Sequence, residues 1–128
     1  MKINKIQHVA IICSDYRKSK EFYVNFLGFK VINEYYRAER NSYKLDLEVG
    51  SFVQIELFSF ENAPERLSYP EALGLRHLAF EVDNIEEAVK ELIGKGILAE
   101  AIRVDEITGK KYTFLSDPDK LPLELYEK

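Results

Sequence analysis

Apolar and polar residues alternate along much of the chain, which is the pattern of half-buried β-strands. The alternation, with the turn residues that bound it, predicts eight strands. They cover residues 4–13, 30–37, 43–49, 52–59, 75–82, 98–103, 111–116 and 121–127. The turn Val49-Gly50-Ser51 joins the third and fourth strands into a hairpin.

Two segments instead carry apolar residues three and four positions apart, as one face of an α-helix requires. The first begins at a capping Ser14 or Asp15 and ends at Gly28. The second begins at Asp83, in a capping-box-like start, and ends at Gly94. A helix therefore follows the first strand of the chain, and another follows the fifth.

The chain repeats itself. His8-Val9-Ala10-Ile11 is echoed 69 residues later by His77-Leu78-Ala79-Phe80, and Ile55-Glu56-Leu57-Phe58 is echoed 68 residues later by Leu123-Glu124-Leu125-Tyr126. A fixed period indicates two copies of one βαβββ module. We predict one domain with module one at 1–60, a linker at 61–74 and module two at 75–128.

Composition narrows the class of protein. The 128 residues suit a compact globular domain, and the net charge of −4 favours neither nucleic acid nor an anionic membrane as partner. No apolar run approaches the roughly 20 residues that span a bilayer, and the N-terminus does not have the pattern of a signal peptide. A single cysteine, Cys13, excludes an internal disulfide and predicts a cytoplasmic location.

The alternation of side chains along the strands places four potential metal ligands on strand faces of the same kind. His8, Glu56, His77 and Glu124 each lie opposite the aliphatic face of their strand, so we expect them on the inside of a curved sheet. A carboxylate in so apolar a strand needs a partner. Two copies related by a pseudo-two-fold axis would bring all four side chains to one divalent cation, whose charge two glutamates neutralise.

These residues also resemble the vicinal oxygen chelate superfamily, which comprises glyoxalase I, bleomycin resistance proteins and dioxygenases. The resemblance covers nearly the whole chain, with a YaeR-like branch of bacterial members most similar. It is carried by His8-Val9-Ala10, the 19–29 segment, Ile55-Glu56-Leu57, His77 to Val82, Phe114 to Asp119 and Leu123-Glu124-Leu125. It implies an α+β fold of two tandem βαβββ modules that form a curved mixed sheet cup around a metal site, with His8, Glu56, His77 and Glu124 as ligands of one Ni, Zn, Co, Mn or Fe ion.

The ligand set distinguishes branches of the superfamily. Extradiol dioxygenases and fosfomycin-type thiol transferases lack a glutamate where this chain has Glu56, and bleomycin-binding relatives lack the ligands altogether. The set is most similar to that of glyoxalase I, a metal-dependent lyase. The resemblance implies conversion of a 2-oxoaldehyde–thiol hemithioacetal to a 2-hydroxyacyl thioester through an enediolate, with Glu124 as the base and Glu56 as the second acid/base or a ligand.

Two other functions stay open. One is a different metal-dependent reaction such as epimerisation of an acyl thioester, and the other is non-catalytic binding of a small molecule. For any of these we expect a small-molecule partner, such as an adduct of glutathione or another thiol, and a homodimer. The cationic candidates for substrate contact are Arg37, Arg40, Arg66 and Lys111.

Overall fold

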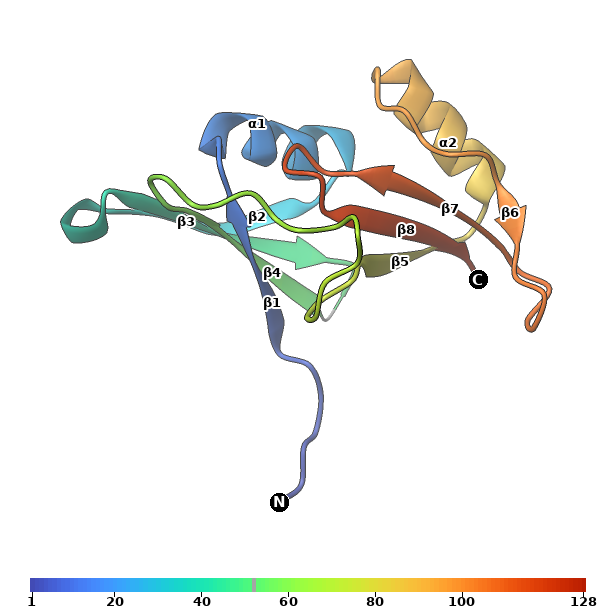
Figure 1. Cartoon of the computed structure of the whole chain (residues 1–128), viewed down its shortest axis with the longest axis horizontal. Coiled ribbons are helices and arrows are strands. Elements are labelled where there is room, and N and C mark those ends of the chain that lie inside the picture. Colours follow the sequence, from blue (N-terminus) through green and yellow to red (C-terminus); the bar gives the residue numbers. More distant parts are fainter. Residues whose placement is uncertain (52) are drawn as a thin grey trace. The chain divides into compact units, whose positions relative to one another are not determined.

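The computed structural model describes residues 1–51 and 53–128, and it divides the chain into two compact units, residues 1–64 and 65–128. Each unit is a four-stranded mixed sheet with helical turns against one face (Figure 1). The predicted strand 52–59 begins at Phe52, which lies outside the described residues. The α+β class and the duplicated βαβββ order are thus confirmed.

The described residues of unit 1 form four strands and three helical segments. In chain order these are β1 (His8–Cys13), α1 (Tyr16–Lys20), the π-helix η1 (Glu21–Phe26), β2 (Lys30–Arg37), the 3-10 turn η2 (Ala38–Arg40), β3 (Ser42–Val49) and β4 (Val53–Ser59). The sheet order is β1-β4-β3-β2. Strand β1 runs parallel to β4, whereas β2, β3 and β4 are antiparallel neighbours.

One face of the unit 1 sheet forms the core. The buried aliphatic residues alternate with polar ones along β3 and β4 and pack with two aromatic residues of η1. The fully or almost fully buried side chains are Phe22, Tyr23, Leu45, Leu47, Ile55 and Leu57. Val53 shares this face of β4 but is 45% exposed, because it lies at the hairpin end of the strand. The opposite face remains open for polar side chains.

Unit 2 repeats this arrangement. It contains β5 (Leu78–Val82), α2 (Ile85–Gly94), β6 (Arg103–Val104), β7 (Lys111–Ser116) and β8 (Pro122–Glu127). The sheet order is β5-β8-β7-β6, with β5 parallel to β8 and the other pairs antiparallel. Its core combines Ile85 and Leu92 of the helix with the buried leucines of β7, of β8 and of the turn that joins them, which are Leu115, Leu121, Leu123 and Leu125.

Several predicted boundaries differ from the structure. The first helix begins with Asp15 as its cap, as expected, but it widens into a π-helix in which Leu27 N–H donates to the Phe22 carbonyl. The second helix is capped by Asn84, which accepts from the Glu87 N–H at 2.9 Å, so the predicted start at Asp83 was one residue early. Both residue types cap helices, and the backbone geometry decides between them.

Several predicted strands are shorter in the structure, three of them by at least three residues. β1 begins at His8 and β5 at Leu78, rather than at residues 4 and 75. The 98–103 strand is reduced to Arg103–Val104. Glu100 still exchanges hydrogen bonds with β7, to the Phe114 carbonyl and from the Thr113 hydroxyl, but these two bonds do not continue a strand ladder.

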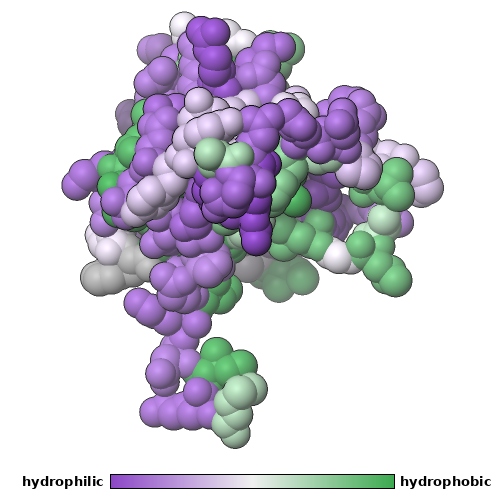
Figure 2. Space-filling model, turned by 90° about the vertical axis from the view of Figure 1, so that its left-hand side faces the viewer, coloured by the Kyte–Doolittle hydropathy of each residue, from purple (hydrophilic) through white to green (hydrophobic). Residues whose placement is uncertain are grey.

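Hydrophilic residues cover most of the surface seen in Figure 2. Residues 1–7 precede β1 and are exposed. Among residues 1–51 and 53–128, no helix has both the length and the apolar character that crossing a bilayer requires.

Glu34 of β2 ties the sheet of unit 1 to its helix. Its carboxylate accepts from Lys20 Nζ at 2.6 Å and from the Tyr16 hydroxyl at 2.8 Å. The hydrogen bonds from Lys20 and Tyr16 lower the pKa of the Glu34 carboxyl. A lowered folded-state pKa means that the carboxylate stabilises the fold above its unfolded-state pKa, and that this contribution is lost as the pH falls through the folded-state pKa.

We therefore expect Glu34→Gln to lower the free energy of unfolding by up to about 1 kcal/mol at pH 7, since the pair is partly solvated. The difference from wild type is expected to be complete above about pH 4.3, the ordinary Glu pKa, and to vanish in more acidic solution. Urea unfolding at several pH values measures it. Glu48→Gln is the control, because the Glu48–Lys30 pair is 3.9 Å long and exposed. An equal loss in both variants would contradict the prediction.

Candidate functional site

The open face of the unit 1 sheet brings His8 and Glu56 together. Strand pairing sets Ala10 beside Glu56, and His8 lies two residues before Ala10 on the same face. His8 Nε2 is 3.7 Å from Glu56 Oε2, and the exposed fractions of the two side chains are 40% and 14%. The small Ala10 side chain, between them on this face, leaves room for this approach.

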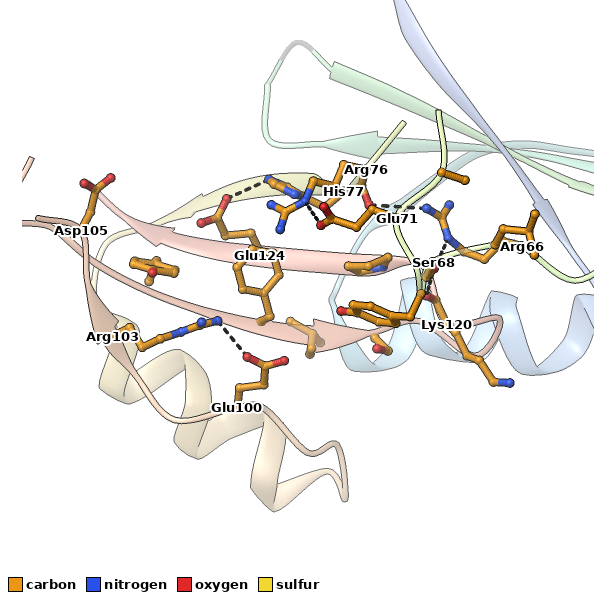
Figure 3. Close-up of a pocket in the computed structure, with 18 of the residues that line it drawn as sticks. Arg66, Ser68, Glu71, Arg76, His77, Glu100, Arg103, Asp105, Lys120 and Glu124 are labelled. Carbon is orange, nitrogen blue, oxygen red and sulfur yellow. Dashed lines mark hydrogen bonds and ion pairs between the residues drawn. The ribbon is translucent and has the colours of Figure 1, made fainter. Parts of the chain in front are cut away.

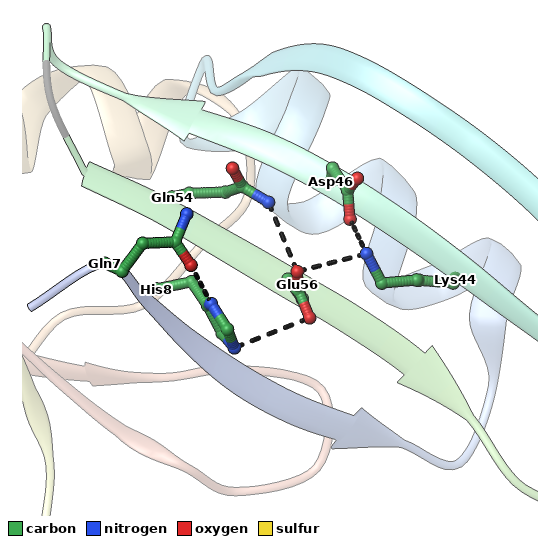
Figure 4. A network of polar contacts seen from close by, with 6 residues as sticks. All are labelled: Gln7, His8, Lys44, Asp46, Gln54 and Glu56. Atoms are coloured by element: carbon green, nitrogen blue, oxygen red, sulfur yellow. Dashed lines mark hydrogen bonds and ion pairs between the residues drawn. The ribbon is translucent and has the colours of Figure 1, made fainter.

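Four further polar residues extend the network around His8 and Glu56 (Figure 4). Lys44 Nζ donates to Glu56 Oε1 at 3.0 Å and to Asp46 Oδ1 at 2.6 Å. Gln54 Nε2 donates to the same Glu56 oxygen at 3.3 Å, and Gln7 hydrogen-bonds to His8 Nδ1. Glu56 thus has one oxygen directed to Lys44 and the other to His8.

Lys44 keeps its positive charge in this network. Burial by itself would lower the pKa of the Lys44 ammonium. The hydrogen bonds to Asp46 and Glu56, together with the Coulomb attraction of both carboxylates, more than compensate and raise that pKa above its ordinary value. The carboxylates therefore enclose a stable cation.

Unit 2 places His77 and Glu124 in the equivalent relation. Ala79 is the partner of Glu124 in the β5–β8 register, and His77 precedes it by two residues. His77 Nε2 is 3.2 Å from Glu124 Oε2, with exposed fractions of 26% and 14%. The imidazole meets the Phe114 ring edge-on at a centroid distance of 5.2 Å. Its Nδ1 is buried and finds no hydrogen-bond partner in the described part of the chain.

His77 and Glu124 line a cavity of about 1410 Å³ that lies within unit 2 (Figure 3). Tyr112 and Phe114 form part of its wall, and Arg103 lies against both rings, 5.1 and 5.5 Å from their centroids. Ion pairs within the lining neutralise two of its arginines. These pairs are Arg76–Glu71 at 2.6 Å and Arg103–Glu100 at 2.8 Å.

The four cationic candidates for substrate contact lie in different places. Arg66 lines the unit 2 cavity and donates to the Ser68 hydroxyl at 2.7 Å and to the Leu75 carbonyl at 3.0 Å. Arg37 shares the open face of unit 1 with Glu56, since its guanidinium lies 4.9 Å from the Phe58 ring centroid. It also donates to the Ser42 hydroxyl at 2.9 Å.

The remaining two candidates are further from the His–Glu pairs. Arg40 ends the exposed 3-10 turn η2. Lys111 is paired with Glu86 of α2 at 2.5 Å, on the side of β7 where Thr113 is buried. Tyr112 and Phe114 lie on the opposite side of β7 and face the cavity. Lys111 is not part of the cavity lining.

The donor spacing suits a metal ion in both units. Histidine nitrogen and carboxylate oxygen bind Zn²⁺ and similar ions at about 2.0–2.2 Å, so two ligands of one ion lie about 3.0–3.5 Å apart. The observed separations of 3.7 and 3.2 Å are close to that range. Each unit supplies two such donors. Within residues 1–51 and 53–128, no group of three or more His, Cys, Asp or Glu side chains is arranged to hold a metal.

The predicted site residues did not include Lys44, Asp46 and Gln54. Their signal was available in the hairpin register, because a turn at 49–51 pairs Val49 with Val53 and therefore Asp46 with Glu56. Arg76 and Arg103 were also missed. No local pattern in the sequence predicts these two arginines as cavity residues. Their place in the cavity depends on how residues 65–76 and 100–107 fold over the sheet.

A sequence profile of the glyoxalase/bleomycin resistance protein/dioxygenase superfamily matches residues 5–125. The chain belongs to this superfamily. Among curated relatives, it is 61% identical over 127 residues to the uncharacterized protein YwkD of Bacillus subtilis, with 99% of both chains covered. It is 53% identical over 125 residues to the uncharacterized protein YaeR of Escherichia coli, covering 98% of this chain and 97% of YaeR.

More distant members of the superfamily include enzymes. Methylmalonyl-CoA epimerase of Homo sapiens is 31% identical over 123 residues, which cover 91% of this chain and 69% of the epimerase. A crystal structure of a glyoxalase family protein from Enterococcus faecalis is 54% identical with a TM-score of 0.91, covering 99% of this chain and 100% of that one. Glyoxalase I of Leishmania major shares the fold, with a TM-score of 0.74 at 23% identity and coverage of 98% and 87%.

Proposed function

We propose that this superfamily member is a metal-dependent enzyme of the glyoxalase I type. It would convert the hemithioacetal of a 2-oxoaldehyde and a thiol, such as glutathione, to a 2-hydroxyacyl thioester. The observation that carries the proposal is the repeated pair of one histidine and one glutamate, with donor atoms 3.7 and 3.2 Å apart at equivalent positions of the two units. Two neutral imidazoles and two carboxylates are a ligand set for Ni²⁺, Zn²⁺, Co²⁺, Mn²⁺ or Fe²⁺.

We propose His8, Glu56, His77 and Glu124 as the ligands of one such ion. Each unit alone offers two donors. The four ligands would be contributed by one chain or by the two chains of a homodimer. A bound divalent cation supplies positive charge next to substrate oxygens that become negative during the reaction.

In this proposal the reaction moves a proton between neighbouring carbon atoms. The Glu124 carboxylate takes the proton from the carbon that bears the thiol, which leaves an enediolate. The neighbouring carbon then receives a proton, and the product is a thioester. The Glu124 side chain is 14% exposed and lines the cavity of unit 2, so a substrate bound there would lie within its reach. Glu56 would stay a ligand or act as the second acid/base.

The cavity of unit 2 is our candidate for the place of the substrate. It contains Glu124 and His77, and its wall combines aromatic rings with the Arg66 guanidinium. Arg66 hydrogen-bonds to a hydroxyl and to backbone carbonyls, so its charge is available for a carboxylate of the thiol adduct. Arg37 would serve the same purpose on unit 1. Cys13 is buried and forms no disulfide within the described residues, which is consistent with our proposal of a reducing, cytoplasmic location.

Epimerisation of an acyl thioester is the second candidate. The 31% identity to human methylmalonyl-CoA epimerase over 91% of the chain favours it. Both reactions begin when a carboxylate removes a proton beside a carbonyl group, so the same four residues would serve. The two functions differ in the substrate and in the carbon that regains the proton.

One experiment tests both candidates. Protein stripped with a chelator is reloaded separately with Ni²⁺ and with Zn²⁺, and is then incubated in heavy water. One sample receives the methylglyoxal–glutathione hemithioacetal, and another receives a 2-methyl-branched acyl-CoA thioester. We expect metal-dependent formation of the 2-hydroxyacyl thioester, measured by absorbance and NMR.

Exchange of the α-proton in the acyl-CoA alone would instead favour the epimerase. Equal binding of a small molecule by stripped and reloaded protein, with no exchange in either substrate, would overturn both and favour a non-catalytic binding protein.

A further inference from the structure

The glutamate of unit 1 is held by more contacts than its counterpart in unit 2. Asp46 is the register partner of Glu56 across the β3–β4 pair, and Lys44 lies two residues before Asp46 on the same face. Lys44 Nζ bridges the two carboxylates at 2.6 and 3.0 Å. Gln54 adds a third hydrogen bond at 3.3 Å.

Unit 2 has aromatic residues at the same positions. Phe114 is the register partner of Glu124, and Tyr112 stands where unit 1 has its lysine. The described contact of the Glu124 carboxylate is with His77 at 3.2 Å, while Arg76 forms its ion pair with Glu71. The duplication has therefore kept the His–Glu pair and has changed what surrounds it.

We propose that Lys44 is a positioning residue that aims Glu56 at the metal and keeps Asp46 out of the ligand set. The Lys44 ammonium binds Glu56 Oε1. The other oxygen, Oε2, faces His8 and would be left to bind the ion. The same ammonium holds Asp46 Oδ1. This inference rests on the proposed metal-dependent function.

Electrostatics explains why a cation is needed there. Asp46 and Glu56 are directly opposite on neighbouring strands, both are largely buried, and like charges in that relation repel. Without Lys44, the Glu56 carboxylate would turn away from Asp46, or Asp46 would itself approach the ion. Either change would disturb the geometry of the metal ligands. Residues that orient a ligand typically contribute about 10–100-fold to metal affinity.

The test is the binding of Co²⁺ to chelator-stripped, folded protein. Affinity is measured by competition with a colorimetric chelator, and the visible absorption of the bound ion reports the ligand geometry. Lys44→Met keeps the aliphatic stem but removes the charge, and we expect it to weaken Co²⁺ binding by about 10–100-fold and to change the spectrum. Lys44→Arg, which keeps the charge, is expected to retain most of the affinity.

Lys20→Met is the matched control. It also removes an ion pair between a lysine and a glutamate of unit 1, with Glu34 at 2.6 Å, but on the helix side of the sheet. Circular dichroism confirms that each variant is folded. If Lys44→Met does not fold, Lys44→Arg and Lys44→Gln take its place, with the arginine variant expected to bind more tightly than the glutamine variant.

A double variant separates positioning from a general loss of packing. Adding Asp46→Asn to Lys44→Met removes the repulsion on Glu56, so we expect it to recover part of the lost affinity and the wild-type spectrum. A Lys44→Met protein that binds Co²⁺ as tightly as the Lys20→Met control, or a double variant no better than Lys44→Met, would overturn the inference alone. Wild-type protein that binds no Co²⁺ would overturn the proposed function, and the inference with it.

Discussion

Replacing Glu124 with glutamine is expected to slow turnover by about 10²–10⁴-fold, the usual contribution of a general base. Glutamine has nearly the same shape but cannot accept the proton from carbon. The fold should be unaffected, because Glu124 lies on the open face of the sheet and the adjacent Leu123 and Leu125 form the core. The measurement is steady-state kinetics with metal-loaded protein, together with exchange of the substrate proton in heavy water.

Two further variants serve as comparisons for Glu124→Gln. Glu91→Gln is the control for the substitution itself, since Glu91 pairs with Lys95 on the exposed side of α2. We expect it to retain wild-type turnover. Glu56→Gln should weaken metal binding more than it changes proton exchange in the fully loaded protein. Turnover of Glu124→Gln within a few-fold of wild type would exclude Glu124 as the base.

Removal of the metal is expected to abolish turnover and to lower the melting temperature. A ligand that binds only the folded state stabilises it by about 2.7 kcal/mol at a hundred times its dissociation constant. For a domain of this size, that corresponds to a shift of roughly ten degrees. Thermal unfolding is followed by circular dichroism before chelation, after chelation and after addition of Ni²⁺ or Zn²⁺.

His8→Gln and His77→Gln test whether both units contribute to the same ion. Each substitution removes one proposed ligand from one unit, and each should reduce the stoichiometric metal binding of the chain and the melting shift that metal produces. Loss of half of the bound metal in each variant would indicate two separate ions instead. If chelation leaves the melting temperature of the wild-type protein unchanged, the metal does not stabilise the fold.

Much of the candidate site follows from local patterns in the sequence. Alternation along the strands was sufficient to put Glu56 and Glu124 on the faces opposite Ile55 and Leu123, because adjacent side chains of a strand point in opposite directions. The internal repeat then made the two histidines equivalent. Neither conclusion needed the distance between strands.

The neighbours of the glutamates depend on pairing between strands that are remote in sequence. The β3–β4 register sets Asp46 opposite Glu56, and the long Lys44 side chain then reaches across to that carboxylate. In unit 2 the helix cap moved by one residue to Asn84 because backbone dihedral angles, and not residue type, select between two good capping residues.

The sequence by itself determined the duplicated βαβββ order, the faces of the strands and the four His and Glu positions, because these depend on the periods of local structure. Only the tertiary structure decided that Lys44 holds Glu56, that Arg66 lines the cavity with His77, and that Lys111 pairs with Glu86 on the helix side. Those contacts join residues distant along the chain, and their partners are chosen by strand register and by the course of the loops, which no local period encodes.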